Sequence, residues 1–512
     1  MTGPQTQSPR GWRPILKRSS RRLLAFAVLA FHGVIGSGAT PAHGFLINGR
    51  WDFTATDGST DPLGNPVTLT WSIVPDGTSI RSRNFVPSTL VSFFDSLWNV
   101  QGGGTDYQQR PWFELVEGSF NRWSEVSGIV FEYEPFDDGL SGRAHGLWSG
   151  LTGVRGDIRL GGAFIDGPSN TLGQAGLIPD GDIVLDTGDA GHFGDPGPDN
   201  SYRNFRNTLT HEVGHSLGLG HLISPNSPFL MESGFQGGFD GPQYDDVRGA
   251  HHLYGDALER GGGNNTAASA SDLGVLNVGA SALFGADGDS GIVLTGDQGN
   301  FLSISNASDV DYLQFTLSEP AVLDVELTPV GPTYNEFLFG VGVVDVVTTA
   351  QNDLSLELYE SGPGGLTLIV ASNSGGVGFV ESVSGVEAPA GDYVVKVAGD
   401  TDAVQLYTLA LNAVAAPEPR LGDFNDDGVV DAADYTVWRD NLGQPDDSTL
   451  LFRGDGSAGV DDGDYQVWRQ SFGLSYEAVA ASSATPEPSA AGALLAGVLV
   501  GVGGRRRTYA KA

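Results

Sequence analysis

The segment that most restricts the fold is HEVGHSLGLGH, residues 211–221. It continues a run of good helix formers, and residues four apart on a helix lie on one face, so His211 and His215 point the same way. Glycine accepts the left-handed conformation that ends helices, so Gly218 can turn the chain and return His221 to the same place. Three neutral imidazoles are a ligand set for tetrahedral zinc that leaves one position open, which is typical of a catalytic site.

Glu212 follows the first histidine, where its carboxylate can reach a water on the metal and act as a general base. The alternative is a set of ordinary histidines on a helix. It is disfavoured because three of only nine histidines in the chain occupy this pattern. Met231 is one of two methionines, the other being the first residue, and we expect it to form a soft apolar floor beneath the site.

Composition excludes several other classes of function. The chain has 62 acidic and 27 basic residues and a formal net charge of −35, so binding to nucleic acid is not expected. It has no cysteine, which excludes disulfides and thiol catalysis. Its 512 residues are too many for one compact domain, and its 75 glycines favour loop-rich β domains.

Breaks in composition divide the body of the chain into three blocks. The first block is residues 45–258, which end at the linker RGGGNNTAAS. The second block, residues 259–413, alternates apolar and polar residues between turn signals, which predicts an antiparallel β-sandwich. The third block, residues 414–475, holds an imperfect repeat, in which DYTVWRDNLG recurs thirty residues later as DYQVWRQSFG.

The first block resembles the matrixins, a branch of the metzincin metallopeptidases. Besides the histidine motif, residues 110–134 are similar to the family's first long helix and following strand, and residues 244–255 to its closing helix. GDIRL and GDIVLD match strands of its sheet. The resemblance implies an α+β catalytic domain that cleaves protein or peptide substrates with one catalytic zinc. It also implies a Met-turn at Met231.

Departures from the matrixin pattern carry their own predictions. Val184 stands where a structural-zinc histidine is usual, so we expect no structural zinc there. Asp182, Asp186 and Asp189 are either calcium ligands or part of a solvated turn. The Met-turn lacks the usual aromatic–proline pair, so the wall of the substrate pocket is expected to differ.

The second block resembles the bacterial pre-peptidase C-terminal domain, on NNTAASASDLG, the segment DVDYLQFTL and GDYVVKV. The resemblance implies a β-sandwich beside a secreted peptidase, acting either as a spacer or as a binding module.

The third block resembles a dockerin type I repeat, a small helical EF-hand-like calcium module. Its loop DFNDDGVVDAAD places oxygen ligands at the spacing of an EF-hand, with Gly428 at the sharp turn. The predicted calcium ligands are Asp423, Asn425, Asp427, Val429 (through its carbonyl), Asp431 and Asp434. The second copy, residues 455–464, is shorter and is expected to bind weakly or not at all. The resemblance implies either docking to a cohesin-like surface partner or a calcium-stiffened stalk.

Both ends of the chain have the features of targeting signals. Residues 1–44 show the basic, apolar and small-residue order of a signal peptide rather than of a membrane anchor. Residues 485–512 resemble a PEP-CTERM sorting signal, with Pro-Glu-Pro-Ser, an apolar run and three arginines. This resemblance implies export, transient membrane retention and removal of the tail by a sorting enzyme. The alternative is a permanent C-terminal anchor.

These features together predict an exported or surface-associated zinc metalloendopeptidase in which Glu212 is the general base. The alternative is a catalytically inactive structural or adhesive surface protein on a peptidase fold. A further alternative is a calcium-dependent docking protein whose main function lies in the second and third blocks. The sequence does not set an oligomeric state.

Overall fold

The computed structural model describes residues 44–60, 62–80, 86–140, 150–168, 170–225, 228–285, 300–338, 340–416 and 420–476. The predicted sorting signal lies outside these residues, as does the predicted signal peptide up to residue 43. Within the described part of the chain, no helix has the length and apolar character needed to span a membrane.

The first block is built on a five-stranded sheet of order β6-β3-β7-β9-β8. Neighbouring strands run parallel except for the edge strand β8, which is antiparallel to β9. The strands are β3 (Val67–Ile73), β6 (Ile129–Tyr133), β7 (Ile158–Ala163), β8 (Gly173–Ala175) and β9 (Ile183–Asp186). Two small pairs accompany them, β1 (Phe53–Thr54) with β2 (Gly58–Ser59) and β4 (Ser79–Ile80) with β5 (Val86–Pro87). GDIRL and GDIVLD thus lead into β7 and β9, as predicted.

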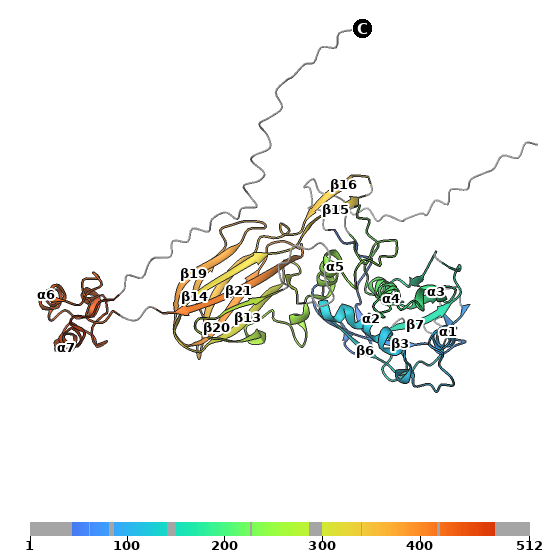
Figure 1. Cartoon of the computed structure of the whole chain (residues 1–512), viewed down its shortest axis with the longest axis horizontal. Coiled ribbons are helices and arrows are strands. Elements are labelled where there is room, and N and C mark those ends of the chain that lie inside the picture. Colours follow the sequence, from blue (N-terminus) through green and yellow to red (C-terminus); the bar gives the residue numbers. More distant parts are fainter. Residues whose placement is uncertain are drawn as a thin grey trace, which may run out of the picture. The chain divides into compact units, whose positions relative to one another are not determined.

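Helices complete the α+β arrangement of this block (Figure 1). They are α1 (Leu90–Leu97), α2 (Phe113–Val126), α3 (Ala190–Phe193), α4 (Arg203–Ser216) and α5 (Tyr244–Tyr254), with short 3-10 turns η2 (Tyr107–Gln109) and η4 (Ala257–Glu259). Helix α2 buries Phe113, Val116, Phe120 and Trp123, which recur at the three- and four-residue spacing of one helix face. The predicted long helix and closing helix are therefore confirmed as α2 and α5.

Aromatic packing ties α2 to the sheet on one side and to α4 on the other. The Phe120 ring stacks on Trp71 of β3 with centroids 4.4 Å apart. The indole N–H of Trp123 donates to the carbonyl of Thr210 in α4 at 2.8 Å. Since α4 carries the first two histidines of the motif, this buried contact sets the position of the site relative to the core.

The second block contains two five-stranded sheets that face each other across an apolar core. Figure 1 shows β14, β19 and β21 in one layer and β13 and β20 in the other. The strands are β10 (Ser271–Leu276), β11 (Ser281–Phe284), β12 (Leu302–Ile304), β13 (Val310–Leu317), β14 (Ala321–Pro329), β17 (Ser355–Gly362), β18 (Gly365–Ser372), β19 (Glu381–Ala388), β20 (Gly391–Ala398) and β21 (Gln405–Ala415), with a separate hairpin of β15 (Thr333–Leu338) and β16 (Gly342–Val347) and a 3-10 turn η5 (Ala267–Ser269). The alternation along β13 and β14 matches their burial, because the apolar side chains face the core.

One pairing corrects the antiparallel prediction. Strand β10 runs parallel to β13, while the other pairs of these two sheets are antiparallel. The chain leaves β10 for β11 and β12 in the opposite sheet and then returns to β13. Strands joined by such a crossover can pair in parallel, whereas a tight hairpin cannot produce this arrangement.

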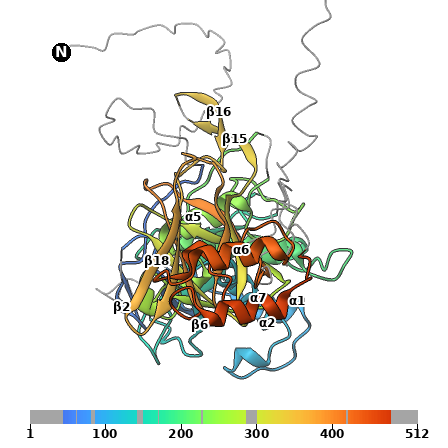
Figure 2. The ribbon, with the colours of Figure 1, turned by 90° about the vertical axis from the view of Figure 1, so that its left-hand side faces the viewer.

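The third block holds helices α6 (Ala432–Asn441) and α7 (Asp462–Ser471), with the 3-10 turn η6 (Asp447–Leu450) between them. Figure 2 shows α6 and α7 in one view. Each begins with a capping box made by two aspartates. Each tryptophan of the repeat donates a hydrogen bond to the residue that precedes the other helix. The Trp438 indole donates to Asp461 O and the Trp468 indole to Asp431 O, both at 2.7 Å.

Candidate metal centre

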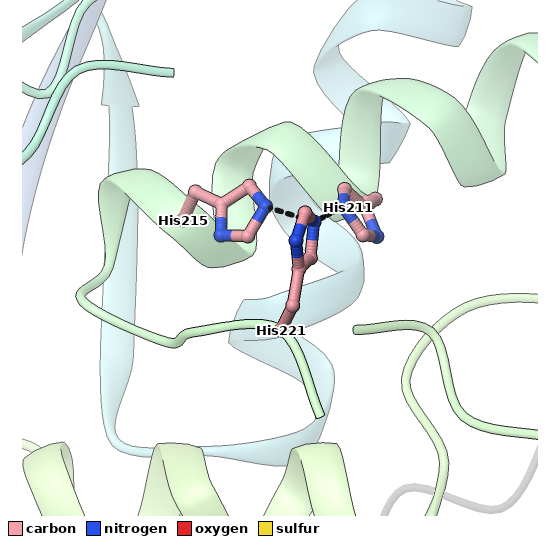
Figure 3. Close-up of side chains that lie close together, drawn as sticks. All are labelled: His211, His215 and His221. Atoms are coloured by element: carbon pink, nitrogen blue, oxygen red, sulfur yellow. Dashed lines mark hydrogen bonds between the residues drawn. The ribbon is translucent and has the colours of Figure 1, made fainter. Parts of the chain in front are cut away.

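Three imidazoles converge at the end of α4. His211 and His215 lie one turn apart on the helix, and His221 reaches them from the loop that follows (Figure 3). The Nε2 atom of His221 lies 3.1 Å from Nε2 of His211 and 2.9 Å from Nε2 of His215. The structure therefore brings the three predicted zinc ligands together, with one nitrogen of each turned towards a common point.

Backbone carbonyls fix the orientation of two of these rings. The Nδ1 atom of His211 lies 2.5 Å from Leu230 O, and Nδ1 of His215 lies 2.8 Å from Leu219 O. Each Nδ1 must carry the proton to donate there, which leaves the Nε2 lone pair free for a metal. Burial lowers the pKa of His211 to about 3 and that of His215 to about 4, so both rings are neutral, as metal ligands must be.

Gly218 makes the turn that returns His221 to the helix. Its φ is +102°, and a Cβ at this position would lie 2.0 Å from the carbonyl oxygen of Gly49. The close approach arises because the N–H of Asn48 donates to Gly218 O at 2.6 Å. Only glycine fits both the left-handed conformation and this contact, so the geometry at Gly218 suits a residue that ends the helix and turns the chain.

Glu212 lies beside the histidines and is 6% exposed. Gly173 in β8 leaves room for it, since a Cβ on Gly173 would lie 2.8 Å from the Glu212 side chain. Burial raises the pKa of Glu212 to about 8, so its carboxyl group can hold a proton near neutral pH. A residue that accepts a proton and later donates it needs a pKa close to the working pH.

Met231 lies beneath the helix, as predicted. A Cβ added at Gly214, between the two helical histidines, would lie 2.4 Å from the Met231 sulfur. The turn that carries Met231 is held by Asp246 of α5, whose carboxylate accepts the N–H groups of Leu230 at 2.7 Å and Met231 at 3.0 Å. The role of Asp246 was not predicted from the sequence, because its partners lie fifteen and sixteen residues away.

An open cleft of about 590 Å³ passes over the three histidines and Glu212. The edge strand β8 lines one part of it, through Gly173, Gln174 and Ala175. The segment after Met231 lines another, with Glu232 and Phe235 among its residues. The cleft can therefore hold an extended chain against β8, whose outer edge has no partner strand within the described part of the chain.

The departures from the matrixin pattern lie on β9 and around it. Val184 is fully buried and packs with Val74, Ala163 and Ile165 in an apolar cluster. Asp186 accepts four backbone N–H groups from the neighbouring loops, and Asp182 accepts the N–H of Arg159. Both carboxylates are buried, so the interpretation of these two as a solvated turn is wrong. Calcium binding by the three aspartates stays a prediction.

The predicted calcium loop of the third block is closed by its own hydrogen bonds. Asp423 accepts the N–H groups of Asp427 and Gly428, while Asp434 accepts those of Asn425 and Asp431. Gly428 has a φ of +83°, as its place at the sharp turn requires. The remaining predicted ligand residues, Asn425, Asp427, Val429 and Asp431, are exposed in the same loop.

The second copy in the third block brings a carboxylate from outside its loop close to the loop aspartates. The thirty-residue repeat puts Arg453 where the first copy has Asp423, so the first ligand is lost. Asp447 of η6 approaches instead, and one oxygen each from Asp447, Asp455 and Asp464 lie within 4.8 Å of one another. Asp447 lies outside the loop and was not among the predicted ligands. Weak or absent calcium binding by the second copy stays a prediction.

Three neutral imidazoles, a buried glutamate and an open cleft on an α+β fold define a domain of the zinc metallopeptidase class. The comparison with protein families identifies the branch, because residues 95–255 match the model of the matrixin family, Peptidase M10. This part of the chain is a matrixin domain.

Curated relatives support the assignment. The chain is 26% identical over 197 residues to matrix metalloproteinase-25 of Mus musculus, covering 37% of this chain and 26% of that protein. It is 40% identical over 96 residues to matrilysin of Rattus norvegicus, covering 18% of this chain and 34% of that protein. The chain thus spans between a quarter and about a third of the length of these relatives.

Two solved structures share weak similarity with this chain. The pre-peptidase C-terminal domain of a Bacillus anthracis collagenase shares 10% identity, with 28% of this chain and 96% of that chain covered and a TM-score of 0.16. A GM1-bound form of the ECX AB5 holotoxin shares 17% identity, with 43% and 92% covered and a TM-score of 0.21. At these TM-scores neither likeness bears on the fold.

Proposed function

We propose that this chain is an exported zinc metalloendopeptidase that hydrolyses peptide bonds in protein substrates. The observation that carries the proposal is the convergence of three neutral imidazoles beside the buried carboxyl group of Glu212. The donor set fits zinc, since two of the rings are anchored through Nδ1 and all three offer Nε2. One tetrahedral position then remains for water or substrate.

When bound by His211, His215 and His221, zinc supplies an acidified water and polarises the scissile carbonyl. The Glu212 carboxylate accepts the proton of the attacking water and later delivers it to the leaving amine. The depth of Glu212 in the cleft keeps this proton away from bulk solvent. Burial also disfavours the charged form of the carboxylate, which makes it a stronger base.

The free edge of β8 supports an extended peptide as the substrate. Among the residues that the structure describes, β8 pairs with β9 on one side only, and its three residues line the cleft. A peptide lying along this edge would add a strand to the sheet through main-chain hydrogen bonds, which bind many sequences alike. Side-chain preference then depends on the wall formed by residues 232–236.

The inactive structural or adhesive alternative finds less support in the site. Loss of activity is expected to leave a missing ligand, a displaced base or a filled cleft. Instead the three histidines converge at an open cleft, Glu212 lines the same cleft, and Met231 packs against the helix, which supports an active site.

Calcium is proposed as a second cofactor, held in the third block. The loop at residues 423–434 has the oxygen donors of an EF-hand-like site. The carboxylates of Asp447, Asp455 and Asp464 form a second candidate, and Asp447 is 5% exposed with one oxygen that has no partner. Arg453 lies 3.3 Å from Asp423 and links the two halves.

The remaining proposals concern the setting of the enzyme. The second block is proposed to be a pre-peptidase C-terminal-like sandwich that acts as a spacer or binds a surface. The third block is proposed to dock on a cohesin-like partner or to act as a stalk. The two ends are proposed to direct export and sorting, so that the peptidase acts outside the cell or at its surface.

The substitution Glu212→Gln tests the proposed mechanism. It removes the base and preserves size and the histidines, so kcat/KM on an unstructured protein substrate should fall by about 10²- to 10⁴-fold. Zinc content should stay at the wild-type value. The exposed Glu114 in α2 provides the matched control Glu114→Gln, which should change neither quantity. Cleavage by Glu212→Gln at the wild-type rate would show that the assigned role is wrong.

A further inference from the structure

A group of carboxylates outside the catalytic site converges where the second block begins. Glu259 ends the turn η4, and Asp309 and Asp311 flank the first residue of β13. Their exposed fractions are 1%, 5% and 0%. One oxygen of each lies within 4.8 Å of the others. Three acidic side chains from two distant segments are thus buried around one point.

Each of these carboxylates is held by one oxygen and leaves the other free. Asp311 accepts the hydroxyl proton of Tyr407 at 2.5 Å, and Asp309 accepts the N–H and hydroxyl of Ser305 at 2.6 and 2.7 Å. Glu259 accepts the Asn265 amide at 3.0 Å. The oxygens without a hydrogen-bond partner are Glu259 Oε1, Asp309 Oδ1 and Asp311 Oδ1. The pattern is that of anchored ligands with one donor atom each to spare.

Asn264 gives an independent indication of a ligand. Its side chain is completely buried, yet neither its amide oxygen nor its amide nitrogen has a partner. It lies next to the carboxylates, because its carbonyl accepts the N–H of Tyr312 at 2.9 Å and its own N–H donates to Glu259. A buried amide is normally hydrogen-bonded. An unpartnered Asn264 amide beside three unpartnered carboxylate oxygens therefore indicates a ligand that all four groups would share.

Positive charge is scarce around the group. No ion pair reaches Glu259, Asp309 or Asp311 among the residues that the structure describes. Asp256 adds a fourth buried carboxylate nearby, and the Arg260 guanidinium is engaged with Ser127 O. Burial, followed by mutual repulsion, raises the pKa of Glu259 to about 9. The group must therefore either take up protons or bind a cation.

We propose that Glu259, Asp309 and Asp311, together with the amide oxygen of Asn264, bind one divalent cation. An all-oxygen set with three carboxylates and an amide is the chemistry that calcium prefers, while magnesium usually keeps several waters. The ligands are buried, so the site is structural. It would join the turn that follows α5 to the first residues of β13, which makes the junction between the first and second blocks dependent on calcium.

The test uses the full chain and the double variant Glu259→Gln/Asp309→Asn. Equilibrium dialysis with calcium should show one bound equivalent fewer than in the wild type. Glu319 and Glu387 are exposed on the same sandwich, so Glu319→Gln/Glu387→Gln carries the same change of charge and should keep the wild-type number. Equal stoichiometry in the double variant and this control would overturn the proposal.

A second measurement stays decisive if the double variant binds calcium poorly for other reasons. The single variant Glu259→Gln removes the cost of burying or protonating one carboxyl group, so in EDTA it should melt above the wild type. In calcium it should melt below the wild type, because a ligand is missing. A proton shared by Glu259 and Asp309 in place of a cation would give no such crossing. Destabilisation in both conditions, or the absence of a crossing, would contradict a cation site.

Discussion

Gly218 fixes the position of His221 although it takes no part in the chemistry. The zinc ligands and Glu212 could be predicted from the sequence because all four lie within eleven consecutive residues. The residues that hold them could not be, because they come from separate elements. Leu230 and Gly173 contact the motif only in the folded chain, and Asp246 acts on it through Leu230 and Met231. Asp447 was missed for the same reason.

Replacement of Gly218 by alanine should displace His221. The new Cβ would collide with Gly49 O at 2.0 Å on a backbone of positive φ, so we expect a loss of stability of about 1–3 kcal/mol together with weaker zinc binding. Urea unfolding and competition with a zinc chelator measure the two effects. Gly191→Ala is the control, because a Cβ at Gly191 meets nothing within 4 Å. Unchanged zinc affinity in Gly218→Ala would contradict the role assigned to this turn.

Helix α4 is held in position by side chains that pack against it from α2 and from the turn that carries Met231. Trp123 of α2 contacts it from one side and Met231 from below, and both converge on Gly214. The long helix, the closing helix and two sheet strands of the first block were predictable from the resemblance to the matrixins. The parallel pairing of β10 with β13 was not, because strand order depends on contacts between segments far apart in sequence.

Two glycines in helices should respond to alanine with opposite signs. At Gly214 the Cβ would lie 2.4 Å from the Met231 sulfur and 2.8 Å from Trp123, so overpacking should cost about 1–3 kcal/mol. At Gly118 in α2 a Cβ meets nothing within 4 Å, so the gain in helix propensity should stabilise by about 0.5–1 kcal/mol. Denaturant unfolding measures both variants. A stabilised Gly214→Ala chain would show that this packing is not tight.

At the scale of the whole molecule, the sequence predicted a multidomain chain, and the structure shows an α+β matrixin domain followed by β-rich sheets. Composition and turn signals marked the blocks because linkers differ locally from folded segments. The cluster of buried carboxylates that includes Glu259 could not be predicted from the sequence, because acidic residues are common throughout this chain. Their convergence depends on the fold that brings η4 to β13.

The most direct test of the central claim is the zinc content of the purified full chain, measured together with its peptidase activity. We predict one tightly bound zinc per chain, loss of activity on chelation, and recovery in proportion to zinc added back until one equivalent is reached. Two tightly bound zincs would contradict the interpretation of Val184. Undiminished proteolysis after complete removal of zinc would contradict the proposed function itself.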